Sequence, residues 1–574
     1  MISSDIFTCI KCDVLVIGSG VAGCNSAISA ARNGANTIMI TKGKVFKSGT
    51  TFFPMNYGFG IQAHTLEAEK GDSIEQHYQD VVTASRGLCD KETAKILVEQ
   101  APVCIQELKK MGINFDKEKD NKSLQVLGCY SSKKRCFQMT GIKQYVNCFS
   151  RELKNNKVQI IEKTSIITLL YDDKNEECLG AVGIDNEGNM LLIDAKATIL
   201  ATGGGNNLFK HSLTTEEMNG DGYALALKAG AMIRNLEFIQ FGWGLLYPSY
   251  KLPFLDRLLR YHPQITNGTG EPIYDKICSA NNWNKLMEQR AIHFPFTCED
   301  DSKIIDKTIL DISLSEKAGK NGGVYINCKG IPIDKISKAP LWPIWYNWLK
   351  SKNLDPLNQK FEITIFAHAF NGGVWIDKNA KTSIDRLYAV GEVASGPHGA
   401  DRLGGNMQLE SIVFGKIAGR NAANLSKISL NVGNDKLIQI LKHIIDSNIK
   451  IDYKKSKENI DIQDIKNKLW KNVSVSRTEK GLISTLDLIL SLKNKCNNWA
   501  NMFIEGDFIK TKQIAELNNF LLAAHSVVLA ALKREESRGT HYRLDYPKHD
   551  DKLYYITLKN GNKNDEINTE KEFL

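Results

Sequence analysis

The sequence predicts an α/β protein: a doubly wound, Rossmann-like domain with an inserted α+β capping domain and a C-terminal helical domain. Three observations predict this architecture. Residues 14–33 have the pattern of a buried strand, a glycine-rich turn and a helix. A second glycine-rich stretch, 398–406, follows far along the chain, after a tryptophan-rich segment of irregular pattern at 242–355. From about residue 434 onward the pattern is helical.

The first glycine-rich stretch has the form of a phosphate-binding turn. Val14 to Ile17 is a short apolar run, typical of a strand buried on both faces. Gly18 permits a tight turn, Gly20 lets the backbone approach a pyrophosphate, and Gly23 lets a helix pack on the strand. The helix at 22–33 would then point its free N–H groups at the phosphates. This context predicts a dinucleotide site.

The second strand, Thr37 to Ile40, departs from the pattern for nicotinamide cofactors. In that pattern the strand ends in an acid that binds the ribose hydroxyls. Here it ends in Thr41 and Lys42. The sequence therefore disfavours a nicotinamide and fits a flavoprotein subgroup in which Ser-Lys or Thr-Lys stands at this place.

The remaining elements follow in order along the chain. Residues 74–116 are predicted to be helical, 117–135 to form a surface loop, and 158–172 and 179–197 to form strands of a small sheet. The clearest apolar helix is 521–532. The predicted domains are 1–241 and 356–428 for the two parts of the cofactor domain, 242–355 for the capping domain, 429–557 for the helical domain, and 558–574 for a disordered tail.

Composition limits the function classes. The chain has 574 residues, 42% of them hydrophobic, and a net charge of +9 that comes from 74 basic and 65 acidic residues spread along its length. No concentrated basic block is present, so nucleic acid is not an expected partner. The apolar stretches are shorter than the ~20 residues of a membrane span, and the N-terminal residues do not read as a signal peptide.

Thirteen cysteines, an odd number and scattered, favour reduced thiols and a cytoplasmic location. Cys9 and Cys12 form one C-x-x-C. Either these are two unrelated thiols, or the pair has a redox or metal role. An iron–sulfur cluster normally needs four thiolates, and no second pair is present, so no metal is predicted.

Further motifs appear in a fixed order along the chain. They are Ser48–Thr51 leading to Gly58–Gly60, Ala201–Gly204, Asn219–Gly222, Glu237–Phe241, His368–Gly373, Leu387–Glu392, His398–Asn406, Trp470–Arg477 and Glu536–Arg543. On these motifs the chain resembles the flavoprotein subunits of fumarate reductase and succinate dehydrogenase, L-aspartate oxidase and their relatives, over almost its whole length.

The resemblance implies FAD as the cofactor. Asp221 and Glu392 would accept hydrogen bonds from ribose or ribityl hydroxyls. A covalent flavin is not expected, because Gly49 to Thr51 lack the histidine of the succinate dehydrogenase type, and His64 lies beyond them. The predicted FAD-binding residues are Gly18, Gly20, Gly23, Thr41, Lys42, Ser48, Gly49, Thr50, Thr51, Gly58, Gly60, Ser165, Thr202, Gly203, Asp221, Glu392 and Asn406.

The resemblance also implies a substrate site. Arg402 would clamp a carboxylate with its planar fork of donors, and His368 would hold the same substrate. Next to these, Gly242 and Trp243 replace the usual His-Pro, and Met407-Gln408 replaces the usual Ser-Leu. The indole of Trp243 is expected to stack on an apolar part of the substrate.

The arginine that usually delivers a proton is missing at 301–303. Arg290 is the first candidate for the proton donor and Lys303 the second. An ordinary lysine has a pKa near 10.4, so Lys303 would need desolvation to act.

These expectations describe an FAD-dependent oxidoreductase that transfers hydride between flavin N5 and a carbon of a small, carboxylate-bearing substrate. Three alternatives stay open. One is a fumarate reductase or L-aspartate oxidase with relocated catalytic groups. Another is an electron-transfer flavoprotein that works with an iron–sulfur or ferredoxin-like partner. The last is a degenerate flavin-binding scaffold without activity.

Overall fold

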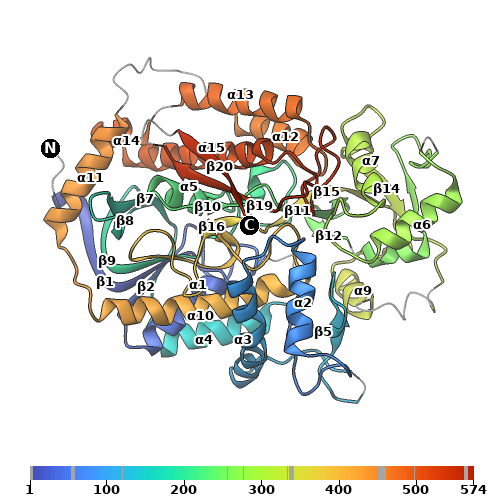
Figure 1. Cartoon of the computed structure of the whole chain (residues 1–574), viewed down its shortest axis with the longest axis horizontal. Coiled ribbons are helices and arrows are strands. Elements are labelled where there is room, and N and C mark those ends of the chain that lie inside the picture. Colours follow the sequence, from blue (N-terminus) through green and yellow to red (C-terminus); the bar gives the residue numbers. More distant parts are fainter. Residues whose placement is uncertain are drawn as a thin grey trace.

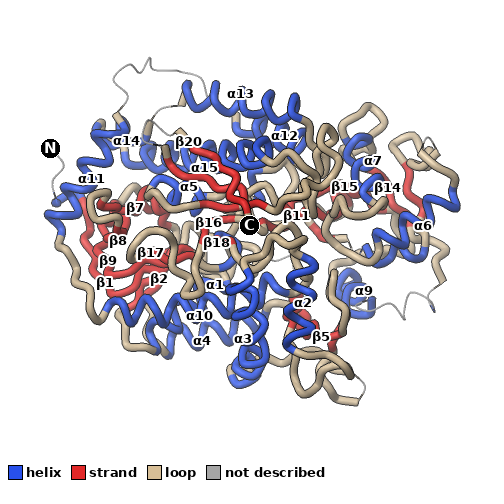
Figure 2. Tube along the Cα trace, in the orientation of Figure 1, coloured by secondary structure: helices blue, strands red, loops and turns tan. Residues whose placement is uncertain are grey.

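The computed structural model describes residues 4–574 except 54–57, 119, 255, 276, 333, 335–341, 450–460, 497 and 562–565. This part of the chain contains four β-sheets with helices packed around them (Figures 1 and 2). The cofactor domain lies on the left in Figure 1, the capping domain on the right, and the C-terminal helices along the top.

The main sheet carries the glycine-rich turn. Its seven strands have the order β6-β2-β1-β9-β8-β7, with β17 beside β9. β6, β2, β1, β9 and β17 are parallel, whereas β8 pairs antiparallel with both β7 and β9. The strands are β1 (Phe7–Ile17), β2 (Thr37–Ile40), β6 (Gln159–Ile161), β7 (Thr164–Asp172), β8 (Glu177–Asp185), β9 (Met190–Leu200) and β17 (Leu387–Ala389).

Two helices pack against each other below this sheet in the view of Figure 2. α1 (Val21–Arg32) follows β1, and α10 (Asn406–Ser426) follows the second glycine-rich stretch. A Cβ atom on Gly419 of α10 would lie 2.3 Å from the backbone oxygen of Ser26 in α1. The close approach of these backbones brings the two glycine-rich stretches together, although they are far apart in the sequence.

The cofactor domain also contains a three-stranded sheet and several further helices. They are β3 (Gly58–Gln62), β4 (Gln125–Leu127), β5 (Lys134–Thr140), α2 (Ile74–Ala84), α3 (Lys91–Lys110), α4 (Lys143–Asn155) and α5 (Asp221–Lys228). β4 and the start of β5 fall in the predicted loop 117–135, where charged and polar residues mask the short strand pattern.

The capping domain is built on a separate sheet with the order β12-β11-β15-β14-β13. Its elements are β11 (Ile239–Tyr247), β12 (Leu252–Pro253), β13 (Gln264–Thr266), β14 (Val324–Asn327), β15 (Phe361–Phe370), α6 (Ala280–Arg290), α7 (Lys303–Ser313) and α9 (Trp342–Ser351). The predicted boundary at 242 falls inside β11, because pairing with β15 already begins at Ile239.

The C-terminal domain is helical, as expected. It contains α11 (Asn434–Asn448), α12 (Ile462–Val473), α13 (Glu479–Lys495), α14 (Trp499–Ile504) and α15 (Phe508–Lys533). α15 packs on α5 and β7 of the cofactor domain. By length and apolar composition α15 could cross a membrane, but 72% of its apolar window is buried inside the molecule, as in the core helix of a folded domain.

The prediction of a disordered tail at 558–574 is wrong for the described residues. β19 (Tyr554–Asn560) and β20 (Ile567–Phe573) form an antiparallel hairpin. β19 also pairs with β10 (Ile233–Arg234), which extends the sheet through β16 (Gly373–Trp375) to β18 (Ala394–Ser395). The polar composition of β20 misled the sequence interpretation, because an edge strand keeps charged side chains on its exposed face.

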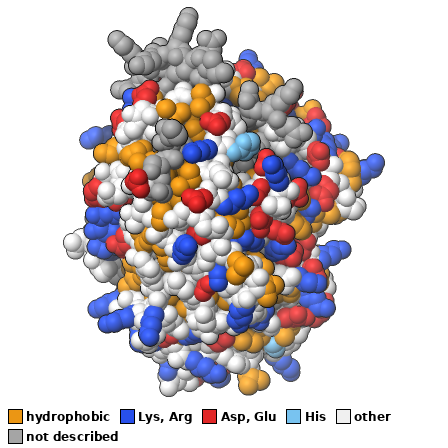
Figure 3. Space-filling model, turned by 90° about the vertical axis from the view of Figure 1, so that its left-hand side faces the viewer, with side chains coloured by type: hydrophobic (Ala, Val, Ile, Leu, Met, Phe, Trp, Pro, Cys, Tyr) orange, Lys and Arg blue, Asp and Glu red, His pale blue; other side chains and the backbone are white. Residues whose placement is uncertain are grey.

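The surface does not concentrate one sign of charge on the face shown in Figure 3. Lysine and arginine side chains alternate there with aspartate and glutamate. This distribution agrees with the even spread of charge along the sequence.

Deleting residues 561–574 should lower the melting temperature by several degrees. The deletion removes β20, the Arg234–Glu572 ion pair of 2.6 Å and the contact between the Tyr554 and Phe573 rings, and it exposes the edge of β19. Differential scanning calorimetry measures the effect. An unchanged transition would show that the hairpin contributes nothing to stability.

Candidate functional site

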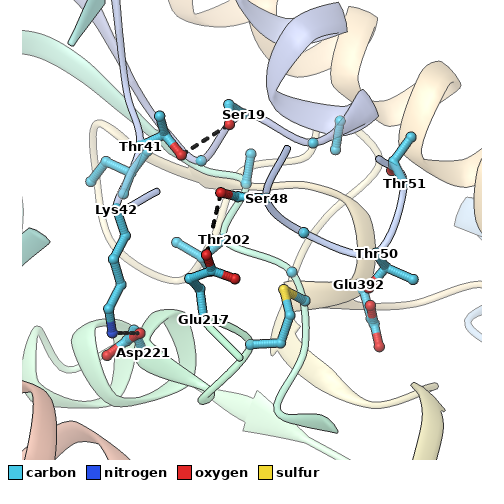
Figure 4. Close-up of a pocket in the computed structure, with 18 of the residues that line it drawn as sticks. Ser19, Thr41, Lys42, Ser48, Thr50, Thr51, Thr202, Glu217, Asp221 and Glu392 are labelled. Carbon is cyan, nitrogen blue, oxygen red and sulfur yellow. Dashed lines mark hydrogen bonds and ion pairs between the residues drawn. The ribbon is translucent and has the colours of Figure 1, made fainter. Parts of the chain in front are cut away.

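A pocket opens at the carboxyl ends of β1, β2 and β9, where doubly wound sheets bind their ligands. Figure 4 shows it in close-up, with the parts of the chain in front cut away. The predicted residues that line it are Gly18, Gly20, Thr41, Lys42, Ser48, Gly49, Thr50, Thr51, Ser165, Thr202, Gly203, Asp221 and Glu392. Met407 and Gln408 also line it. Gly23, Gly58, Gly60 and Asn406 are not part of the lining.

The three glycines of the first turn have different roles. A Cβ atom on Gly18 would lie 2.1 Å from the backbone oxygen of Ala201, and one on Gly23 would lie 2.1 Å from that of Gly18. These two glycines are required by packing. A Cβ on Gly20 would meet only Thr51 Oγ1, at 3.8 Å. Gly20 therefore leaves the start of α1 open to a ligand, as phosphate binding requires.

Hydroxyl groups fix the loop that covers the pyrophosphate position. Ser19 Oγ donates to Thr41 Oγ1 at 2.9 Å (Figure 4). Ser48 Oγ accepts from the backbone N–H of Lys44 at 2.9 Å. The N–H of Gly49 donates to Thr215 Oγ1 at 3.0 Å. These bonds hold the two sides of the pocket in place before a ligand is bound.

Charged groups stand at the other end of the pocket. Lys42 extends from the end of β2, and its Nζ lies 3.2 Å from Asp221 Oδ2 at the start of α5 (Figure 4). Burial alone would lower the pKa of Lys42, but the charges of Asp221 and Glu516 raise it. The lysine therefore stays charged.

Glu392 is the buried acid of the pocket. It accepts hydrogen bonds from Asn206 Nδ2 at 2.8 Å and from the backbone N–H of Phe370 at 3.0 Å. Burial raises its pKa. Burial and the charge of Glu392 raise the pKa of nearby Glu410 to about 8. The two carboxyls are therefore not both charged at neutral pH.

The residues present fit FAD. Thr50 Oγ1, Thr202 Oγ1 and Gln408 Oε1 are buried polar atoms with no hydrogen-bond partner in the described part of the protein. Buried polar atoms without partners are costly, so a ligand with hydroxyls and ring nitrogens would satisfy them. Together with Gly20, Asp221 and Glu392 they would hold the ribityl, pyrophosphate and ribose groups.

Asn406, Gly58 and Gly60 support the pocket from outside its lining. The Oδ1 of Asn406, at the start of α10, lies 3.2 Å from Nε2 of His77. Burial lowers the pKa of His77 to about 4, so the ring is neutral and Nε2–H donates. Gly60 packs on Cys136, whose Sγ would lie 2.6 Å from an added Cβ, and Gly58 packs on β5. No sequence pattern pointed to His77.

The predicted substrate residues come together beside this pocket. Arg402 is 7% exposed, and its Nη2 and Nε donate to Gln240 Oε1 at 2.8 and 3.1 Å. Burial, followed by the charge of Arg402, lowers the pKa of His368 to about 3 and that of His398 well below its usual value. Both histidines are therefore neutral beside the guanidinium. His398 belongs to a matched motif, yet the sequence did not single it out.

Backbone geometry places His368 at this point. β15 carries a bulge opposite β11: Gln240 pairs with Ala369, and Phe241 pairs with Ala367. His368 is the extra residue between them. A bulge aims a side chain that regular pairing would direct elsewhere, and bulges are frequent beside active sites.

Family models agree with the pocket. A model described as an FAD binding domain matches residues 13–257 and 311–407, and one described as the C-terminal part of fumarate reductase flavoprotein matches residues 462–572. The chain belongs to the fumarate reductase/succinate dehydrogenase flavoprotein superfamily. It is an FAD-dependent oxidoreductase that acts on CH–CH or CH–NH groups.

Known proteins match along almost the whole chain. A fumarate reductase (CoM/CoB) subunit of Methanothermobacter marburgensis is 29% identical over 542 residues, which cover 94% of this chain and 95% of that protein. L-aspartate oxidase of Vibrio cholerae is 28% identical, with coverage of 94% and 96%. Mycobacterium smegmatis Sdh1 has the same fold, with a TM-score of 0.81 at 24% identity, over 99% of this chain and 94% of that one.

Trp243 does not line the substrate site of this flavoprotein, contrary to expectation. It is fully buried, and its Nε1 donates to Asp306 Oδ1 at 2.9 Å. Phe294 takes the space beside Gly242 instead: a Cβ on Gly242 would lie 2.6 Å from its ring. The Phe294 ring also packs edge-on against His368, with centroids 5.0 Å apart. The apolar wall of the site is therefore Phe294, contributed by the capping domain.

Arg290 lies inside the capping domain, and its role as proton donor stays a prediction. It is fully buried and forms an ion pair with Asp306, with Nε 2.8 Å from Oδ2. Its guanidinium also lies over the Trp243 ring, 5.2 Å from the centroid. Lys303 is held as well, because its Nζ donates to the backbone oxygen of Cys298 at 3.1 Å.

The two cysteines of the C-x-x-C sequence lie on opposite faces of one strand. Cys9 and Cys12 are three residues apart on β1, so they point to opposite faces. Cys9 is exposed and Cys12 is buried. Burial raises the pKa of the Cys12 thiol. Of the two alternatives, the structure supports two unrelated thiols.

Denaturation with acid should release FAD from the purified protein, because Gly49 to Thr51 contain no histidine and the His64 ring pairs with Asp72 at 3.1 Å. The measurement is the visible absorbance of the supernatant after precipitation. A yellow precipitate that retains its flavin would contradict a non-covalent cofactor.

Proposed function

We propose that this enzyme transfers hydride between flavin N5 and a carbon of a small substrate with one carboxylate and an apolar part. The observation that carries the proposal is Arg402. Among the described residues its guanidinium bonds only to neutral oxygens, those of Gln240 and Leu403. The charges of Asp401 and Glu392 offset part of the cost of burying this cation, but neither carboxylate bonds to the guanidinium directly, and an anionic substrate would relieve the remaining cost.

Neutral neighbours make Arg402 selective for one carboxylate. His368 and His398 stay uncharged at physiological pH, so they donate hydrogen bonds without adding positive charge. Nε2 of His398 is buried and has no partner in the described part of the chain. A carboxylate on Arg402 would therefore accept a bond from a histidine as well, which fixes its orientation for reaction.

The wall beside His368 favours an apolar group at the other end of the substrate. Phe294 fills the volume next to Gly242, where the related flavoproteins usually have a histidine. The bound flavin supplies the electron-pair chemistry, and the described residues bind, orient and exclude water. An enoate or a related acid with an apolar substituent fits this arrangement.

Fumarate reduction or L-aspartate oxidation is the second candidate. It is supported by the relatives named above, which have these activities in their names.

A third candidate is a flavoprotein that exchanges electrons with an iron–sulfur partner. This role is compatible with either of the first two. Relatives such as the 8-methylmenaquinol:fumarate reductase flavoprotein subunit of Wolinella succinogenes, 30% identical over 94% of this chain and 87% of that protein, are subunits by name.

We also propose a reducing, cytoplasmic environment for this enzyme. All thirteen cysteines are free thiols, and most are buried. Free cysteines in this number are typical of proteins from reducing compartments.

An anaerobic substrate screen tests these proposals. The reduced or oxidised enzyme is mixed with dicarboxylates, amino acids and enoates, and the flavin absorbance is followed. Turnover of an enoate with one carboxylate supports the first candidate. Turnover of fumarate or L-aspartate alone supports the second.

Arg402→Lys should lower kcat/KM about tenfold to over a hundredfold with the best substrate of this screen, because a lysine cannot offer the two parallel donors of arginine. The FAD content should stay the same. Arg420→Lys, an exposed position on α10, is the matched control. Normal turnover by the Arg402 variant would remove Arg402 from the carboxylate site.

Fumarate should reoxidise the reduced enzyme slowly or not at all, because Phe294 leaves no polar group for its second carboxylate beside Gly242. Stopped-flow absorbance measures the rate, and Phe294→Ala tests whether this wall sets the preference. Rates of ~1–1000 per second, typical of enzymes, would contradict this prediction.

A further inference from the structure

The far end of the cofactor pocket receives side chains from the C-terminal domain. Two residues of α15, Glu516 and Asn519, stand nearly one helical turn apart and therefore share one face of the helix. Asn519 Nδ2 lies 3.5 Å from Asp221 Oδ1, and Asn519 Oδ1 accepts from Lys228 at 2.8 Å. This face of α15 thus lies against the charged end of the pocket.

Glu516 contacts two residues of the pocket lining. Ser165 Oγ donates to Glu516 Oε1 at 2.5 Å, and Lys42 Nζ lies 3.5 Å from the same oxygen. In the part of the chain that the structure describes, Glu516 Oε2 makes no hydrogen bond. Glu516 is not itself part of the pocket lining, but its side chain is 28% exposed and adjoins two residues that are.

Glu516 lies near the place where a dinucleotide fold usually has an acid for the ribose hydroxyls. At this point an acid at the end of the second strand normally binds the ribose hydroxyls of the adenosine. β2 ends in Thr41 and Lys42, which carry no carboxylate. Lys42 instead reaches back and lies between two carboxylates, those of Asp221 and Glu516.

We propose that Glu516, from the C-terminal helical domain, binds the adenosine part of FAD by accepting a hydrogen bond from a ribose hydroxyl. The pyrophosphate is not its target, because a carboxylate repels phosphate and the phosphates belong at Gly20 and the start of α1. Lys42 lies between the two acids and offsets one of their two negative charges, which lowers the repulsion between them beside the same ribose. Asp221 and Glu516 would thus share the task of the missing acid.

One consequence is that the cofactor joins two domains. Glu516 belongs to a helix whose middle is packed on α5 and β7. Binding of FAD would therefore hold α15 against the cofactor domain, in addition to filling the pocket.

The affinity for FAD tests the proposal in a way that does not depend on the substrate. Glu516→Ala should weaken FAD binding about tenfold to a hundredfold, the usual effect of losing a hydrogen bond to a charged group. Glu516→Gln should show a smaller loss. Glu505→Gln, an exposed acid at the end of α14, is the control and should bind normally. Fluorescence titration of the apoprotein gives the dissociation constants, and its melting temperature shows whether folding is affected.

Cofactor analogues separate direct contact from a loosened structure. The two analogues are FAD with 2′-deoxyadenosine and FAD with 3′-deoxyadenosine. One of them lacks the hydroxyl that Glu516 binds, so the wild type should bind this analogue more weakly than FAD. The Glu516→Ala variant should bind this analogue and FAD with equal affinity. Unchanged FAD affinity in Glu516→Ala, or an equal loss for both analogues in the variant and the wild type, would overturn the proposal. Neither result bears on the carboxylate site, which the substrate screen tests separately.

Discussion

The structure depends on the close contact between the first glycine turn and β9. Gly18 touches the backbone of Ala201, and Gly23 touches Gly18, at distances that exclude any side chain. This contact sets where α1 begins, and α10 then packs on α1 through Gly415 and Gly419. Because α10 starts at Asn406, four residues after Arg402, the same contact fixes the pyrophosphate position and the substrate anchor relative to each other.

Burial gives the charged groups of the site their character. Glu392 and Glu410 have raised pKa values, and that of Glu410, about 8, keeps this carboxyl protonated at neutral pH. His368 and His398 have lowered pKa values and stay neutral. Arg402 is thus a buried charged group beside neutral histidines, and an anion bound there would offset part of the free-energy cost of its burial.

The C-terminal domain supports the site through buried ion pairs as well as through α15. Arg534 pairs with Glu237 at 2.5 Å and with Glu536 at 2.6 Å, and all three side chains are at most 1% exposed. Glu237 lies just before β11, the strand that carries Gln240 and Gly242. The hydrogen-bond partner of Arg402 is therefore held from the domain that also carries Glu516. Breaking such a pair leaves a buried charge uncompensated, which makes this connection rigid.

The sequence by itself determined the cofactor domain, the order of the domains, the family, and most of the pocket lining, because glycine spacing and apolar runs are local properties of the chain. The tertiary structure decided the rest. Trp243 was expected to contact the substrate but lies in the core of the capping domain, where it and Arg290 both bond to Asp306. Phe294, His77 and Glu516 reach the site or its support from distant elements, and no local pattern marks them. The polar tail was predicted to be disordered, but β20 is stabilised by its pairing with β19, which the sequence does not reveal. These contacts join segments that are far apart in the sequence, so only the folded structure reveals them.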